Sequence, residues 1–322
     1  MLKKDYKLFI PEESSEIITE NVKVLRKIEN KFRDIFNKYK ITETLVSSFD
    51  YLELYKQVYD DFEDNKVFKY IGSKGEIIAL RWDYTIPIAR YYCLQNTDKE
   101  AKFSYFGKVF RKEKKYKGRN SEEYQAGIEL INVKSKGNEL CLKILQESLN
   151  VLKLDDLKLE FGSAKLFNRI CELFGNNEEI IEILSKKNIS AMKKFIYEKN
   201  IDNKSAQFLL KLPRLCGNIE MLNLIINQIS DKVILEALLE LKEIYEKVPN
   251  KENIIFDLSM CPTMKYYTGI MFKVYSKNAP YPLVCGGRYD WLYKKFGRDV
   301  EAIGMSYYFS NILKALESEV KR

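Results

Sequence analysis

The chain has 322 residues, of which 46% are hydrophobic and 13% aromatic, so it can bury a large core in one or two domains. No apolar run approaches the roughly eighteen residues of a membrane span, and the first residues lack an apolar signal segment. We therefore expect a cytoplasmic protein. Lys and Arg number 54 against 46 Asp and Glu, a formal charge of +8, and the complete absence of histidine excludes histidine acid–base catalysis and most catalytic zinc sites. The six cysteines have no CxxC spacing, so we expect buried free thiols, with no disulfide, metal site or cofactor.

The first predicted element is a long amphipathic helix over residues 14–40. Its apolar stripe runs from Ile18 to Phe36, and Ser14 or Ser15 stands at the N-cap position. The next predicted elements are an extended segment over 42–54, a hairpin of strands 66–71 and 76–80, and a short helix over 86–94. We expect this hairpin to deliver Arg81 and Asp83 to a pocket.

Residues 105–131 predict two antiparallel strands joined by a long loop. Apolar residues alternate before the loop and again after it, which is typical of half-buried strands. The loop concentrates charge, with a net of +6 from these residues: Lys108, Arg111, Lys112, Glu113, Lys114, Lys115, Lys117 and Arg119. Such a basic loop suits a polyanion such as a nucleoside triphosphate, although a solvated surface hairpin is equally compatible with the charge alone.

The second strand adds a stronger signal. Gln125 and Glu129 are four residues apart, so they share one face of the strand within an apolar pattern. Polar side chains buried in such a place are costly unless something pairs with them. We therefore expect a binding pocket on this face of the strand.

The remaining predicted elements complete the fold. They are a helix over 137–152, a strand over 157–161, a helical segment over about 164–248, strands over 253–258, 268–275, 283–286 and 302–307, and a helix over 310–317. Hairpins without regular parallel units predict an α+β fold. We expect an antiparallel sheet flanked by helices and interrupted by an all-helical insertion.

Four stretches resemble the catalytic core of class II histidyl-tRNA synthetases over nearly the whole chain. They are the hairpin of residues 105–131, IALRWDYTIPIAR (78–90), KYYTG (265–269) and CGGRYDWL (285–292). The resemblance implies that Arg111 and Glu113 face ATP. It also implies a histidine pocket built by Asp83, Thr85, Gln125, Glu129, Tyr266 and Tyr267, with Arg111 at its phosphate side. Residues 42–54 resemble the family's first motif, which builds the dimer interface, except that Ser47 replaces a proline.

The sequence departs from the synthetase pattern at both activating arginines. Residues 262–265 read Pro-Thr-Met-Lys where the family has Arg-Gly-Leu-Asp, and residues 308–311 read Tyr-Phe-Ser-Asn where it has Gly-Leu-Glu-Arg. Glu123 stands where the family stacks an aromatic ring on adenine. Because arginines neutralise the charge that develops on a triphosphate, their loss predicts that no adenylate forms. We therefore expect no catalytic residue in this chain, and the resemblance implies that it lacks an anticodon-binding domain.

A histidine pocket without these arginines resembles the ATP phosphoribosyltransferase regulatory subunits, which are paralogues of the synthetase. That resemblance implies a hetero-octamer with the catalytic subunit of ATP phosphoribosyltransferase, activation of this partner, and feedback inhibition by histidine. Two alternatives stay open. One is an amino-acid-activating enzyme, and the other is a nucleic-acid-binding module, for which the loop has only Tyr116 as an aromatic side chain.

Overall fold

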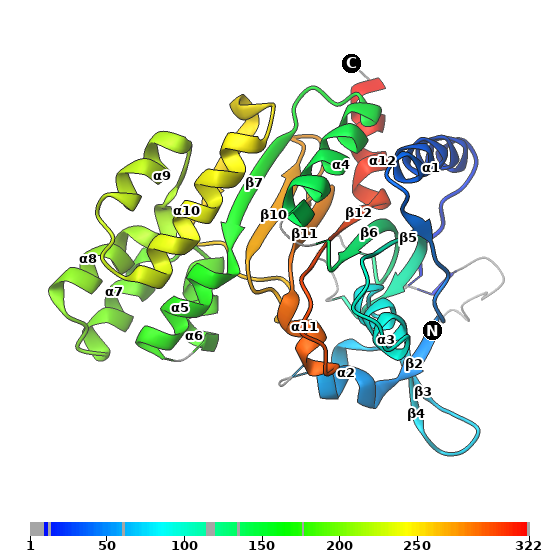
Figure 1. Ribbon diagram of the computed structural model, residues 1–322, viewed down its shortest axis with the longest axis horizontal. Helices are drawn as coiled ribbons and strands as arrows, with labels where there is room; N and C mark the ends of the chain where they lie inside the picture. The colour runs from blue at the N-terminus through cyan, green and yellow to red at the C-terminus, as the bar shows by residue number, and fades with distance from the viewer. Residues whose placement is uncertain are drawn as a thin grey trace, which may run out of the picture.

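A computed structural model describes residues 10–11, 14–59, 62–113, 120–133, 136–175 and 177–320 of the chain (Figure 1). The helices are α1 (Glu20–Lys38), α2 (Leu52–Val58), α3 (Thr85–Leu94), α4 (Gly137–Leu152), α5 (Ala164–Phe174), α6 (Asn177–Ser185), α7 (Ile189–Glu198), α8 (Asn203–Lys211), α9 (Ile219–Ile226), α10 (Lys232–Lys247), α11 (Asp290–Lys295) and α12 (Phe309–Val320). The strands are β1 (Thr42–Glu43), β2 (Phe49–Tyr51), β3 (Lys69–Ile71), β4 (Ile77–Leu80), β5 (Ala101–Phe110), β6 (Glu122–Ile131), β7 (Lys158–Ser163), β8 (Cys216–Gly217), β9 (Ile254–Asp257), β10 (Ile270–Tyr275), β11 (Val284–Arg288) and β12 (Ala302–Tyr308). Most of the basic loop predicted between β5 and β6, from residue 114 to residue 119, lies outside the described residues.

Nine strands form the main sheet, in the order β1-β5-β6-β12-β11-β10-β7-β9-β8. The predicted hairpin is confirmed as β5 and β6, which pair antiparallel along all ten residues from Ala101↔Ile131 to Phe110↔Glu122. The purely antiparallel sheet is wrong, because β1 pairs parallel with β5 and β7 pairs parallel with β9. Parallel neighbours need a crossover connection, and the helical segment between β7 and β9 supplies one of them.

The helical segment lies beside the sheet at the β7 side, in green and yellow in Figure 1. It contains α5 to α10, and α10 packs against α5, α9 and β7. The segment is not all-helical, because β8 within it pairs with β9 through Cys216↔Asp257 and Gly217↔Phe256. Helix α8 lies within the segment that was predicted to be helical.

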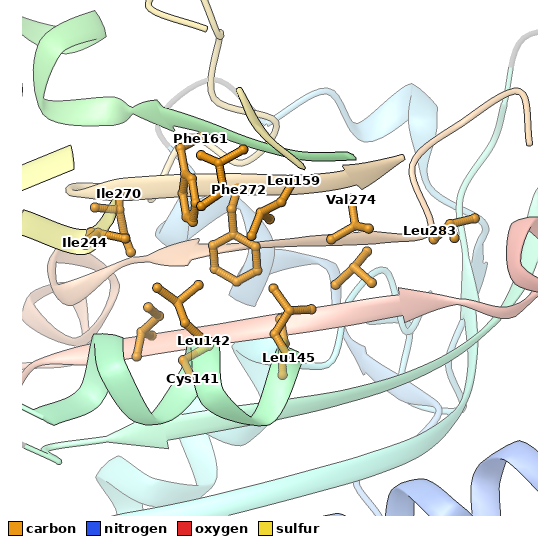
Figure 2. Close-up of a cluster of buried hydrophobic side chains, with 14 of the residues drawn as sticks. Cys141, Leu142, Leu145, Leu159, Phe161, Ile244, Ile270, Phe272, Val274 and Leu283 are labelled. Atoms are coloured by element: carbon orange, nitrogen blue, oxygen red, sulfur yellow. The ribbon is translucent and has the colours of Figure 1, made fainter. Parts of the chain in front are cut away.

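The larger core lies between the sheet and helices α1, α4 and α12 and continues into the helical segment. Helix α4 has the predicted limits and points Leu142 and Leu145 at the sheet, where Phe161 of β7 and Phe272 of β10 meet them (Figure 2). Alternate residues of β6, namely Ala126, Ile128 and Leu130, belong to the same core. The opposite face of β6 therefore carries Glu123, Gln125 and Glu129.

Helix α1 begins later than predicted, at Glu20 instead of residue 14. The Ser15 hydroxyl donates to the carbonyl oxygen of Glu122 at 2.8 Å, and the Ser14 hydroxyl donates to the carbonyl oxygen of Pro11. The predicted N-cap is therefore wrong, because both serines bond to backbone groups outside the helix.

A smaller sheet, β2-β4-β3, lies next to α2 and α3 (Figure 1). The predicted hairpin is confirmed as β3 and β4, whereas α2 replaces the end of the extended segment over 42–54. Several large apolar side chains of this region are exposed to solvent: Leu45, Phe49, Tyr51, Tyr70, Ile71, Ile77, Tyr91 and Leu94. Within the described ranges, none of the helices has the length and apolar character to cross a membrane.

Candidate functional site

A cavity of about 650 Å³ opens on the face of the main sheet opposite α4. Its walls come from the turn between β4 and α3, the residues after β5, strands β6, β10, β11 and β12, the loop before β10, and the first residues of α12. Six of the seven predicted site residues line it: Asp83, Thr85, Arg111, Glu129, Tyr266 and Tyr267. The topology therefore gathers residues from four separate stretches of the chain at one place.

Gln125, the seventh predicted residue, is buried on the same strand face but is not one of the residues that line the cavity. Its register places it between Gly107 of β5 and Tyr308 of β12. Its side-chain nitrogen has no hydrogen-bond partner in the part of the chain that the structure describes.

Asp83 is fixed by its own turn. Its Oδ1 accepts a hydrogen bond from the backbone N–H of Ile86 at 2.9 Å, in the first turn of α3, and its Oδ2 accepts from the Tyr59 hydroxyl at 3.3 Å. Burial raises the pKa of Asp83 to about 6, although the Ile86 N–H and the charge of Arg111 lower it. The carboxylate is thus held in place and remains ready to pair with a cation.

Glu129 is held by the first residues of two helices. The Thr85 hydroxyl, at the start of α3, donates to Oε1 at 2.8 Å, and the Tyr289 hydroxyl, just before α11, donates to Oε2. Burial raises the pKa of Glu129 to about 8, and the negative charge of Asp83 contributes to that rise. The cavity therefore contains an acid that a cationic or N–H-donating ligand would drive to its ionised form.

Gly304 of β12 provides the space for this arrangement. A Cβ atom at this position would lie 2.1 Å from Glu129 Oε2, 2.6 Å from the carbonyl oxygen of Ile128 and 2.8 Å from the Tyr289 hydroxyl. Only glycine leaves room for the carboxylate and the hydroxyl together. Tyr289 and Gly304 are site residues that the sequence analysis missed, although Tyr289 lies within the quoted CGGRYDWL stretch.

Aromatic rings form one wall of the cavity. The Tyr266 ring lies 5.5 Å from the rings of Tyr267 and Tyr289 and 5.7 Å from that of Tyr59, measured between centroids. Burial raises the pKa of Tyr266 and of Tyr267 well above the usual tyrosine value, so both hydroxyls are neutral donors at ordinary pH. We call Asp83, Thr85, Glu129, Tyr266 and Tyr289 the acidic end of the cavity.

Arg111 lines the cavity beside Trp82. Its Nε donates to the carbonyl oxygen of Trp82 at 2.8 Å, and its guanidinium carbon lies 5.0 Å from the centroid of the Trp82 ring. Burial lowers the pKa of Arg111, but Tyr308 and Asp83 raise it by more, so it stays protonated. The buried indole N–H of Trp82 has no acceptor among the described residues.

The other end of the cavity lies where β12 runs directly into α12. The Glu123 carboxylate accepts hydrogen bonds from the Ser310 backbone N–H at 3.1 Å and from the Ser310 hydroxyl at 2.6 Å. The Asn311 side chain donates to the carbonyl oxygen of Pro282 at 3.0 Å. We call Glu123, Ser310 and Asn311 the α12 end. Glu123 and Glu129 are six residues apart on β6, so their Cα atoms lie about 20 Å apart.

The expectation for Arg81 is wrong, because it does not line the cavity. Its guanidinium donates to the carbonyl oxygens of Val46, Ser47 and Lys108 at 2.7–3.1 Å and lies 4.0 Å from the centroid of the Tyr84 ring. Arg81 therefore joins three backbone segments. Within the described residues, no group of three or more cysteine or acidic side chains could hold a metal ion, and none of the six cysteines is in a disulfide.

Comparison with known proteins gives the following relatives. The family model for histidyl-tRNA synthetase matches residues 14–312. An ATP phosphoribosyltransferase regulatory subunit from Lactococcus lactis subsp. lactis is 39% identical over 315 residues, covering 96% of both chains. A regulatory subunit of the same name from Bacillus cereus is 32% identical and covers 96% of this chain and 76% of its own.

Two solved structures share the fold. A protein from Bacillus halodurans described as an ATP phosphoribosyltransferase regulatory subunit/histidyl-tRNA synthetase superimposes with a TM-score of 0.86 at 24% identity, covering 97% of this chain and 84% of that one. A histidyl-tRNA synthetase from Nostoc sp. PCC 7120 superimposes with a TM-score of 0.76 at 17% identity, covering 98% and 75%. The mixed sheet with flanking helices is thus of the class II synthetase type.

Proposed function

Because the chain belongs to the family of ATP phosphoribosyltransferase regulatory subunits, we propose that it binds and activates a short catalytic subunit in the first step of histidine biosynthesis. The observation that carries this proposal is the 39% identity to the Lactococcus lactis regulatory subunit over 96% of both chains. The chain is a regulatory subunit and does not catalyse the reaction itself.

The cavity supports a non-catalytic role. Arg111 is the single arginine among the described lining residues, which also include Lys66, Lys112 and Lys273. Activation of an amino acid by ATP relies on arginines held against the triphosphate, where they neutralise the developing charge. Thr263, Met264, Ser310 and Asn311 line the cavity in the two stretches where the synthetase pattern has its other arginines. These side chains cannot neutralise a charge that develops on phosphate.

Histidine is the ligand that we assign to the acidic end, where it would transmit feedback inhibition. Asp83 and Glu129 suit an α-ammonium group and an imidazole N–H, and the ring of Tyr266 can flank the imidazole. Arg111 and the unpartnered indole N–H of Trp82 suit the α-carboxylate. Gln125 does not line the cavity, but a rotation of its side chain would let its unbonded amide nitrogen donate a hydrogen bond to the ligand.

The exposed apolar side chains around the smaller sheet support self-association. Ile71 and Leu94 are 76% and 77% exposed, and six further large apolar residues accompany them. Exposed large apolar side chains gathered in one region of a protein are typical of a protein–protein interface. Ile71→Glu should therefore shift the sedimentation coefficient toward that of a monomer, whereas Leu224→Glu in the helical segment should not. Equal sedimentation of both variants would refute this interface.

We also place all the described residues in one synthetase-like core, with residues 164–248 as an insertion. Strands β7 and β9 flank the helical segment in sequence and pair with each other in the sheet. The segment therefore leaves and re-enters the sheet at neighbouring strands.

Complex formation tests the proposed function. The purified chain mixed with the short ATP phosphoribosyltransferase subunit from the same genome should elute as one larger species in size-exclusion chromatography. The chain alone should give no ATP–pyrophosphate exchange with histidine and no phosphoribosyl transfer. Separate elution of the two proteins, or exchange by the chain alone, would contradict the proposal.

A further inference from the structure

The loop between β9 and β10 runs from the helical segment to the acidic end of the cavity. We call residues 258–269 the tyrosine loop, because it carries Tyr266 and Tyr267. Met264 of this loop also lines the cavity, and its sulfur accepts a hydrogen bond from the Tyr59 hydroxyl at 3.7 Å. The position of the aromatic wall therefore depends on the path that the tyrosine loop takes from the end of β9.

A lysine of the helical segment holds the start of this loop. Lys187, between α6 and α7, donates from its Nζ to Asp257 Oδ2 at 2.7 Å and to the Ser259 hydroxyl oxygen at 2.8 Å. Asp257 is the last residue of β9, and its Oδ1 accepts from the backbone N–H of Ser259 at 3.0 Å and from the Ser259 hydroxyl at 2.6 Å. One ammonium group thus joins the end of the strand to the first turn of the tyrosine loop.

Burial distinguishes this ion pair from a surface salt bridge. Asp257 is 6% exposed and Ser259 is 3% exposed, so the acceptors of the lysine are withdrawn from water. Exposed ion pairs contribute little, whereas a buried carboxylate needs a partner for its charge. Lys187 supplies that partner from a different part of the fold.

The backbone fixes Lys187 as well as its side chain does. The Lys187 N–H donates to the carbonyl oxygen of Leu184 at 3.0 Å and the Asn188 N–H to that of Ile183 at 2.9 Å, the pattern of a Schellman motif at the end of α6. The φ of 49° at Lys187 is the left-handed conformation that this motif uses. The Asn188 side chain then caps α7 by accepting from the Ala191 N–H. Lys187 therefore lies at the junction of two helices.

Uncharged contacts join the same two regions. The Leu258 N–H donates to the carbonyl oxygen of Leu215 at 2.9 Å, and the Cys261 sulfur lies 3.9 Å from the carbonyl oxygen of Ile181. Strand β8 of the helical segment also pairs with the end of β9. Removal of the Lys187 ammonium leaves these contacts in place, so its contribution can be tested by itself.

We propose that Lys187 is a positioning residue for the ligand site, which fixes the tyrosine loop and so couples binding at Tyr266 and Tyr267 to helices α6 and α7. The inference rests on the proposed function, because L-histidine is the ligand that probes it. A ligand packed against the two tyrosines restricts the loop at one end, and Lys187 holds it at the other. Since coupling is reciprocal, a change at Lys187 must alter the affinity for that ligand.

Hydrogen–deuterium exchange of the full-length chain, with and without L-histidine, tests the proposal. In the wild type, histidine should slow exchange in the tyrosine loop and also in residues 177–198. Lys187→Met removes the ammonium group and keeps an unbranched side chain, so histidine should no longer slow exchange in residues 177–198. Its affinity for histidine, measured by calorimetry, should fall about tenfold, a typical coupling between two sites. Lys187→Arg should retain both properties of the wild type.

Lys186→Met is the matched control, because Lys186 pairs with Glu182 within α6. It should behave as the wild type. The double variant Lys187→Met/Asp257→Asn removes both charges, so its melting temperature should return toward that of the wild type while the coupling stays lost. Slowed exchange in residues 177–198 that persists in Lys187→Met, is missing from the histidine-bound wild type, or is lost equally in Lys186→Met would overturn the proposal. Recovery of the coupling in the double variant would overturn it too.

Exchange without ligand separates this inference from the proposed function. Without histidine, residues 258–267 should exchange faster in Lys187→Met than in the wild type or Lys186→Met, and equal rates would overturn the inference. If the wild type binds no histidine, the assignment of that ligand fails, and the ligand-free comparison still decides the role of Lys187. Failure to activate the catalytic subunit would refute the proposed function and leave the exchange results standing.

Discussion

The two ends of one cavity differ in what satisfies their polar groups. At the acidic end, Thr85 and Tyr289 hold Glu129 and the Ile86 N–H holds Asp83, and both carboxyl groups still line the cavity. At the α12 end, Glu123 and Ser310 satisfy each other. The comparison teaches that one cavity can keep carboxyl groups available to a ligand at one end, while a carboxylate of the protein itself occupies the hydrogen-bond donors at the other end.

Among the changes proposed here, Gly304→Ala at the acidic end should have the largest effect on histidine binding. The added Cβ would lie 2.1 Å from Glu129 Oε2 and 2.6 Å from a backbone oxygen, so both the carboxylate and Tyr289 must move. We expect the affinity for L-histidine, measured by calorimetry, to fall about a hundredfold or more because two charged hydrogen bonds lose their geometry.

Gly137→Ala is the control for this change, since a Cβ there meets no atom closer than 3.5 Å. It should leave the affinity for histidine within about twofold of wild type, below the energy of one hydrogen bond. Wild-type affinity in Gly304→Ala would mean that histidine does not use the Glu129 position.

Glu129→Gln should have the next largest effect. The amide oxygen can accept from one of the two hydroxyls, of Thr85 or Tyr289, and the amide N–H can donate to the other hydroxyl oxygen, so the change removes mainly the charge offered to the ligand. A charged hydrogen bond contributes about 1.5 to 3 kcal/mol, so the dissociation constant for histidine should rise about tenfold or more. The matching change at the α12 end, Glu123→Gln, should leave that constant within about twofold. A similar loss of histidine affinity in both variants would contradict the assignment of histidine to the acidic end alone.

A smaller effect concerns pH. Free Glu129 has a pKa raised to about 8 by burial, and a bound N–H donor favours its carboxylate form, so histidine binding should release a proton. Between pH 7 and pH 8 the affinity should therefore rise about fivefold in the wild type and remain flat in Glu129→Gln. Calorimetry in buffers of different ionisation enthalpy counts the released proton directly. Binding of histidine without release of a proton would contradict the assignment of Glu129 to the histidine site.

The stability of the ligand-free protein follows the same linkage. The folded-state pKa of Glu129, about 8, lies above its ordinary value of 4.5, so the folded chain binds this proton more tightly than the unfolded chain. The resulting stability is fully present below pH 4.5 and is lost as the pH rises through 8. The free energy of unfolding, measured relative to Glu129→Gln, should decrease over this range.

Local sequence patterns predicted much of the fold. The alternation in β5 and β6 and the apolar stripe of α4 predicted those elements, because each pattern lies within one continuous segment. The parallel pairing of β7 with β9 and the late start of α1 were missed, because both depend on contacts with distant segments, such as the bond from Ser15 to Glu122.

The candidate site shows the same limit. Asp83, Thr85, Glu129, Tyr266 and Tyr267 were proposed from a family resemblance, and the topology brings them to one cavity. Strand pairing decides which other residues reach the cavity. Gln125 shares the face of Glu129 but is packed between Gly107 and Tyr308. Gly304 enters the site because β12 pairs Gly304 with Glu129, a register that neither strand reveals alone.

The most direct test of the central claim is the turnover of the short ATP phosphoribosyltransferase subunit as this chain is titrated into the assay. The rate should rise from a low basal value and saturate at a fixed stoichiometric ratio, while this chain alone turns over neither phosphoribosyl pyrophosphate nor histidine with ATP. An unchanged rate at saturating concentrations of a correctly folded chain, or formation of histidyl-adenylate by the chain itself, would contradict the regulatory role.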